Sequence, residues 1–155
     1  YVLLQIKQVR SLPMIHDITT DTVRPAQFVA LASARRAAPN GSDYGGARIA
    51  QQQKAAYPDI APFESAQAPH ALFDQALAAA RAAGWTIAAA QREEGRIEAT
   101  ASTRIFGFKD DIVLRISPSG SGSVLDMRSM SRVGISDVGA NARRIRTFLA
   151  TLRRQ

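Results

Sequence analysis

Arginines and glycines crowd one short stretch of this chain, residues 128–146, where a strand is expected to give way to a helix. The stretch reads Arg-Ser-Met-Ser-Arg-Val-Gly-Ile-Ser-Asp-Val-Gly-Ala-Asn-Ala-Arg-Arg-Ile-Arg. A helix start presents unpaired backbone N–H groups, and guanidinium groups fork onto carboxylate or phosphate oxygens, so an anion can bind at such a place. The candidate ligand-binding residues are Arg128, Arg132, Ser136, Asp137, Asn141 and Arg144.

The same stretch also suits a purely structural corner. Ser136 or Asp137 is placed to cap the last helix, where a side-chain oxygen satisfies backbone amides and a negative charge opposes the helix dipole. Gly134 and Gly139 permit a tight turn before that helix. The arginines would then bond to Asp137 and to carbonyl groups of the same chain. The sequence leaves the anion site and the internally paired corner open as alternatives.

A second group of residues with possible chemistry is the carboxylate pair Asp110 and Asp111. With Asp137, they would suit a hydrolase or transferase that uses a divalent cation. Neighbours in a strand point to opposite faces, so the pair would serve one site only if it lay in a turn. His16 and His70 are the only histidines, which excludes a multi-histidine metal centre.

Familiar enzyme motifs are missing from the sequence. There is no Gly-x-Ser-x-Gly elbow and no glycine fingerprint for nucleotides. No metal or cofactor is therefore expected, no catalytic residue is identified, and a non-enzymatic binding module is favoured over the metal-dependent enzyme.

The charge of the chain is concentrated at its C-terminal end. The chain has 155 residues and a formal net charge of +7. Residues 128–155 hold seven arginines against the single carboxylate of Asp137. Such a basic end suits phosphate or another anionic small molecule, nucleic acid or an anionic lipid headgroup as partner, or is a solvated helix face. Nucleic acid is not expected, because aromatic residues make up only 6% of the chain and stacking support is missing.

The elements that would position these residues can be read from breakers and periodicity. Six prolines between Ser11 and Pro69 predict a loop-rich N-terminal half. Helices are expected at Ala26–Ala38, Ala47–Ala56, 70–83 and from about Val138 onward, and strands near 85–89, 97–101, 112–116 and 124–130. Residues 118–122, Pro-Ser-Gly-Ser-Gly, predict a hairpin connection between the last two strands.

These elements predict a two-layer α+β fold. The strands form a four-stranded antiparallel meander, and the helix at 70–83 and the last helix pack on one face of it. Alternation leaves the opposite face polar, with Glu98, Thr100, Ser102, Arg104, Arg115, Asp126 and Arg128. The two helices leave that face open. It is then solvated, or a shallow platform for an anionic ligand, or covered by the loop-rich N-terminal half.

The first ten residues differ from the rest of the chain. Tyr1–Arg10 reads as the juxtamembrane end of a preceding membrane region, or as an ordinary amphipathic first element. No run of 18 apolar residues lies within the chain. Residues 11–155 are expected to form one domain, because 46% hydrophobic residues supply a core and there is no cysteine for a disulfide framework.

Several motifs in order carry a resemblance to a known family. They are Leu12–Asp21, Tyr57–Pro62, Gly84-Trp85, Arg96–Thr100, Phe106–Asp111 and the stretch from Arg128 through Ile145. From about Ser11 to Leu152 the chain resembles the family catalogued as domain of unknown function 1499, in its bacterial membrane-associated form. The resemblance implies anchoring in the bacterial inner membrane, with the domain facing the periplasm. It supplies no activity, so the expectation is a membrane-tethered envelope domain that binds an anionic ligand or an envelope partner.

Overall fold

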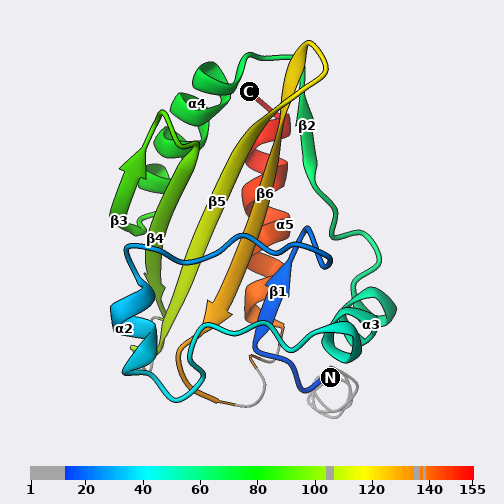
Figure 1. The fold of residues 1–155 in the computed structure, drawn as a ribbon, viewed down its shortest axis with the longest axis vertical. Helices are drawn as coiled ribbons and strands as arrows, with labels where there is room; N and C mark the ends of the chain where they lie inside the picture. Colours follow the sequence, from blue (N-terminus) through cyan, green and yellow to red (C-terminus); the bar gives the residue numbers. More distant parts are fainter. Residues whose placement is uncertain (1–12, 104–106, 135–136, 138) are drawn as a thin grey trace, which may run out of the picture.

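The computed structural model describes residues 13–103, 107–134, 137 and 139–155 (Figure 1). Its strands are β1 (Asp17–Thr19), β2 (Phe63–Ser65), β3 (Thr86–Gln91), β4 (Arg96–Ser102), β5 (Lys109–Ser119) and β6 (Gly122–Ser131). Its helices are α2 (Ala32–Arg36), α3 (Ala47–Ala56), α4 (Pro69–Ala82) and α5 (Ala140–Arg153). The domain is therefore of the α+β class, as the sequence predicted.

All six strands form one antiparallel sheet. Its order is β1-β6-β5-β4-β3, and β2 pairs with the part of β6 that β1 leaves uncovered. The central meander from β3 to β6 agrees with the prediction, but the count of four strands was wrong. The two extra strands have three residues each, which is too short for an alternating pattern to be recognised in a proline-rich segment.

One face of the sheet packs against α4 and α5, which lie behind the strands in Figure 1. The apolar side chains of β4, β5 and β6 on this face share one core with those of both helices. The buried sheet residues of this core include Ile97, Ile112, Leu114, Leu125 and Met127, and the helix residues include Leu72, Phe73, Ile145, Phe148 and Leu149. No helix among the described residues combines the length and hydropathy needed to cross a bilayer.

The other face of the sheet is covered by residues 20–44, here called the N-terminal segment, which crosses in front of the strands in Figure 1. Its residues Ala26, Phe28 and Leu31 pack against Val113 and Met130 in a second, smaller hydrophobic cluster. Of the alternatives that the sequence left open for the polar face, cover by the loop-rich half of the chain is therefore the one that the structure shows, and the open, solvated face was wrong. The sheet is covered on both sides, and the loop-rich half of the chain forms the second cover.

Polar residues of the covered face are buried with partners. Glu98 is fully buried, and its carboxylate accepts the backbone N–H groups of residues 29, 30 and 31 at 2.8–3.1 Å. Asp126 and Arg128 are also buried, while Ser102 remains exposed and Arg104 lies outside the described residues. Polar side chains of this strand face thus form hydrogen bonds to loop backbone that has no partner in a strand or helix.

The same carboxylate explains why the helix expected at Ala26–Ala38 is only Ala32–Arg36. Glu98 takes the N–H groups just before residue 32, and an N–H group bound by a side-chain acceptor in this way belongs to a helix start rather than to a helix interior. The remaining helices begin and end within about two residues of their predicted positions, which is the usual uncertainty of helix ends.

Turns between the long strands depend on glycine. Gly120 lies in the two-residue connection between β5 and β6 with φ +58, and open space surrounds the position where a Cβ would be. Gly95, before β4, has φ +67, and a Cβ there would lie 2.1 Å from the carbonyl oxygen of Ile116. Gly95 also accepts the N–H group of Ile116 at 2.7 Å, so the two backbones are held in close contact.

We predict that Gly95→Ala destabilises the domain much more than Gly120→Ala. Both substitutions force an L side chain into a left-handed conformation, which costs about 1–2 kcal/mol. Only Gly95→Ala adds a clash with backbone that is fixed in the sheet. Urea unfolding of both variants measures the difference, and equal losses of unfolding free energy would contradict the close approach.

Candidate functional site

The arginine- and glycine-rich stretch, residues 128–146, contains the capped start of α5. The carboxylate of Asp137 accepts the N–H groups of Gly139 at 2.8 Å and Asn141 at 3.0 Å. Asp137 therefore satisfies amides at the start of α5 in place of Gly139, the N-cap residue, which has no side chain to do so. Ser136, the other candidate donor of this corner, lies outside the described residues. An anion could reach these amides only by displacing the Asp137 carboxylate.

Asn141 and Arg144 lie on the helix side of the sheet. Asn141 is fully buried, and its side-chain oxygen accepts hydrogen bonds from Ser129 Oγ at 2.6 Å and from Arg144 Nη1 at 2.8 Å. Arg144 also forms an ion pair with Asp110 at 2.9 Å, and its side chain is 15% exposed. These contacts fix the guanidinium of Arg144 rigidly against the sheet.

Arg128 lies on the other side, under the N-terminal segment. Its guanidinium pairs with both carboxylate oxygens of Asp17 at 3.0 and 2.8 Å and is 5.2 Å from the ring centre of Phe28. It forms part of the wall of a small polar cavity of about 240 Å³, together with Tyr44. Arg128 is only 2% exposed, so its positive charge is paired with Asp17 inside the fold and is not presented at the surface.

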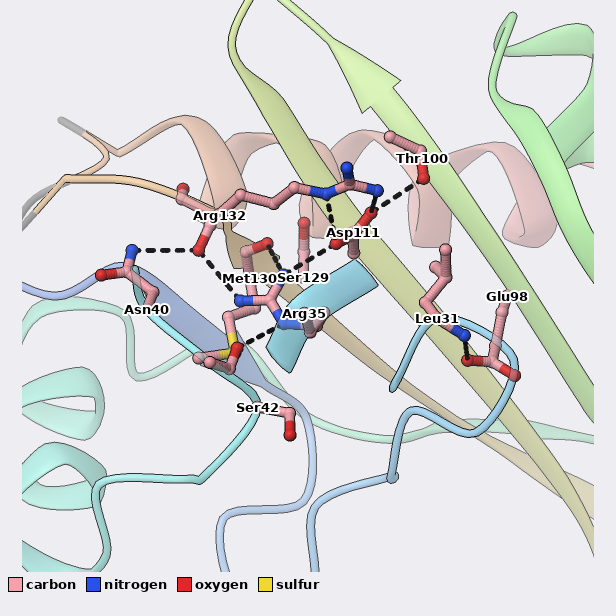
Figure 2. Close-up of polar contacts among 12 residues, drawn as sticks. Leu31, Arg35, Asn40, Ser42, Glu98, Thr100, Asp111, Ser129, Met130 and Arg132 are labelled. Atoms are coloured by element: carbon pink, nitrogen blue, oxygen red, sulfur yellow. Dashed lines mark hydrogen bonds and ion pairs between the residues drawn. The ribbon is translucent and has the colours of Figure 1, made fainter. Parts of the chain in front are cut away.

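Arg132 takes part in a charge cluster around the fully buried Asp111, shown in Figure 2. It pairs with both oxygens of Asp111 at 2.8 and 3.0 Å. Arg35 of α2 reaches the same carboxylate at 2.9 Å and also donates to the carbonyl groups of Met130 and Ser131. Arg35 and Asp111 are both fully buried. One carboxylate thus holds two guanidinium groups from distant parts of the chain.

The cluster keeps its charges despite this burial. Removal from water lowers the pKa of Arg35, an effect that the neighbouring Asp111 carboxylate opposes. The hydrogen bonds that Arg132 donates to Asp111 raise the pKa of Arg132. Arginine titrates so far above neutral pH that both guanidinium groups stay protonated. Two positive charges, one fully buried and one part-buried, therefore share the single negative charge of Asp111.

The six candidate ligand-binding residues thus do not form one cluster. Arg144, Asn141 and Asp137 lie together at the start of α5, while Arg128 and Arg132 lie under the N-terminal segment on the opposite face. The reason is the alternation of β6, which sends Ser129 toward the helices and Arg128 away from them. Each of the three candidate arginines pairs with a carboxylate of the same chain.

The carboxylates of the alternative hydrolase are separated as well. Asp110 and Asp111 are consecutive in β5, so they point to opposite faces, where Arg144 and Arg132 hold them. Asp137 is occupied as the cap of α5. Across the described ranges of the chain, no three His, Asp or Glu side chains are grouped as metal ligands would be. This geometry supplies no shared site for a cation held by these three aspartates.

A larger groove lies between α4 and α5, with a volume of about 760 Å³. Trp85 and Phe148 stack in it with ring centres 5.0 Å apart. Short side chains leave the space open on the α4 side, and polar side chains of α5 border it. The lining residues are Ala79, Ala82, Ala83, Trp85, Ala140, Arg143, Arg144, Thr147, Phe148 and Thr151.

Sequence reasoning found only the basic part of this groove. Arg144 was a candidate beside the helix start, whereas Trp85 was expected only as part of the strand near 85–89. The available signal was the alanine-rich second half of α4, which leaves two large aromatic rings without large neighbours on that helix.

Residues 17–152 match the family described as "Protein of unknown function (DUF1499)". The chain belongs to this family. No curated protein matches it. The matched residues begin with β1 and end in the last turn of α5, so the covered sheet, the N-terminal segment and the groove all belong to the DUF1499 domain.

We predict that the Asp111→Asn variant of this DUF1499 domain loses about 3–5 kcal/mol of unfolding free energy, the range for removing one partner of a buried ion pair. The fully buried guanidinium of Arg35 and the part-buried one of Arg132 would lose their counter-charge. The matched control is Asp59→Asn, because Asp59 also accepts from two guanidinium nitrogens of an arginine, Arg146, but is 56% exposed. Its loss is expected to stay below about 1 kcal/mol. Equal losses in urea unfolding would show that Asp111 is not the central contact.

Tyr44 supplies a prediction for alkaline pH. Burial, aided by the charge of Asp17, raises the pKa of Tyr44 to about 12 from 10.0. The unfolded chain therefore releases this proton first as pH rises, and the stability that the neutral hydroxyl contributes is present below pH 10 and is lost between pH 10 and about 12.

Tyr44→Phe tests this pH dependence. The Tyr44 hydroxyl is buried without a hydrogen-bond partner in the described part of the structure, so its removal is expected to be neutral or slightly stabilising at neutral pH. Unfolding measured across this pH range is expected to show a smaller alkaline loss for Tyr44→Phe than for the wild type. An unchanged loss would place the titrating group elsewhere.

Proposed function

We propose that this DUF1499 domain is a non-enzymatic module that binds an anionic amphiphile in the groove between α4 and α5. The observation that carries the proposal is the pairing of an apolar floor, Trp85 and Phe148, with the basic border of Arg143 and Arg144 in one groove. Its volume of about 760 Å³ lies within the range of about 300–1,000 Å³ that is usual for small-molecule sites.

The two parts of the groove suit two parts of such a ligand. A hydrocarbon chain laid over the aromatic rings gains about 0.8 kcal/mol per buried methylene group. Arg143 is exposed at the border, where it is accessible to an acidic headgroup. Arg144 is already held by Asp110, Ser129 and Asn141, so it presents its remaining surface without further ordering.

The proposed setting is the bacterial envelope. We place the domain at the periplasmic side of the inner membrane, tethered through a preceding membrane region. An anionic lipid headgroup, another anionic small molecule or an envelope protein would meet the groove there. The support for this setting is the resemblance described above and the apolar and basic composition of residues 1–10.

Trp85 offers a direct test, because it is the only tryptophan of the chain and lies in the groove. Titration with lysophosphatidylglycerol below its micelle concentration is expected to shift the Trp85 emission to shorter wavelength and to saturate. Lysophosphatidylcholine, which has no net charge, is expected to bind more weakly. Glycerol phosphate, which lacks the hydrocarbon chain, is expected to leave the emission unchanged.

Three variants define the site. Arg143→Ala is expected to weaken binding about tenfold, the effect of losing one charged hydrogen bond. Ala82→Leu is expected to abolish it by filling the groove. Arg153→Ala removes an exposed arginine of the same helix outside the groove and is expected to bind like the wild type. Absence of a saturable Trp85 response, or equal responses of Arg143→Ala and Arg153→Ala, would overturn the proposal.

A further inference from the structure

Apolar side chains gather at the end of the sheet where β5 begins and β6 ends. Five large hydrophobic residues of the described chain are exposed, and three of them, Met14, Phe108 and Val133, lie in loops at this end. Their exposed fractions are 66%, 52% and 41%. We call these three side chains the strand-end surface.

The hydrogen bonds of the strands place these residues in a row. Asp110 pairs with Ser131, and the pairing continues as Arg132 donates its N–H group to the carbonyl of Lys109. Val133 is therefore opposite Phe108. On the other side of β6, the carbonyl groups of His16 and Ile15 accept N–H groups from Ser131 and Asp137, which brings Met14 to the same end. Figure 1 shows the start of β1, the start of β5 and the end of β6 together at the lower end of the domain.

Two exposed basic side chains lie near this row. Lys109 is exposed between Phe108 and the buried Asp110. Arg36 is also exposed and follows Arg35, whose guanidinium reaches the last residues of β6. The carboxylates of the strand ends, Asp17, Asp110 and Asp111, are buried and paired with arginines, so they do not offset these two positive charges at the surface.

We infer that the strand-end surface inserts its apolar side chains into the headgroup region of an anionic lipid bilayer. Apolar loop tips flanked by basic side chains suit a membrane interface, where burial of apolar surface and attraction to anionic lipid act together. A specific protein interface needs about 800 Å² of matched surface on each partner, which three loop tips do not supply. The inference rests on the membrane location proposed above, but it does not rest on the ligand groove.

Co-sedimentation of the full chain with vesicles tests this contact. Vesicles of phosphatidylglycerol and phosphatidylcholine in equal parts are expected to retain the wild type, and vesicles of phosphatidylcholine alone to retain much less. Phe108→Ser and Val133→Ser are each expected to weaken retention, by roughly tenfold for the larger phenylalanine. Val23→Ser is the matched control, because Val23 is 84% exposed but lies in the loop after β1, away from this end.

The outcomes separate this inference from the proposed function. Ala82→Leu is expected to bind vesicles like the wild type, and Val133→Ser is expected to keep the Trp85 response to lysophosphatidylglycerol. The inference is wrong if the wild type does not bind anionic vesicles, or if Val23→Ser weakens binding as much as Val133→Ser. Loss of vesicle binding in Ala82→Leu alone would assign membrane contact to the groove instead and would also overturn it.

Discussion

The fold of this domain depends on one buried carboxylate, Asp111, which holds Arg35 and Arg132. Arg35 belongs to the N-terminal segment, Asp111 to the start of the central strand β5 and Arg132 to the connection that leads to α5. A residue that bonds to all three regions determines where the N-terminal segment lies on the sheet. Removing the Arg35 guanidinium from water is costly unless it finds charge and carbonyl partners, and Asp111 and the end of β6 supply them. The N-terminal segment contributes only Ala26, Phe28 and Leu31 to the second hydrophobic cluster, so the Asp111 contact and the Glu98 carboxylate carry much of its attachment.

Periodicity in the sequence was sufficient to predict the strands and helices that form the core under α4 and α5. The alternation of residues 97–101 and 112–116 and the apolar stripes of the two long helices reflect burial on one side only, which periodic patterns report well. The N-terminal segment has no such period. Its position comes from single long-range contacts such as Arg35 to Asp111, 76 residues apart, and no local pattern encodes them. The polar strand face was identified correctly, but the partners that bury it were not.

The candidate site shows the same limit at the level of side chains. Arginines that are close in sequence were treated as one group, although strand alternation sends Arg128 and Ser129 to opposite faces of β6. The count of charges was correct, yet the excess does not form one patch, because four of the seven arginines pair with aspartates from outside residues 128–155. These four are Arg128, Arg132, Arg144 and Arg146. The groove between α4 and α5 was not predicted, because the apolar character of Trp85 and Phe148 is equally typical of core residues in a strand and in a helix.

The two edges of the sheet have a consequence for how the domain behaves among other chains. On one edge, the Gln53 side chain donates to the carbonyl of Thr19 and accepts its N–H group, so it occupies the outer hydrogen-bonding positions of β1 as a neighbouring strand would. On the other edge, the register of β3 shifts between Ile87 and Ala89, which disturbs the regular spacing that an added strand needs. An added strand would therefore find the hydrogen-bonding groups of Thr19 in β1 already occupied and the spacing along β3 irregular. At β1 and β3, copies of the domain at high local concentration lack a regular, open strand edge along which to pair.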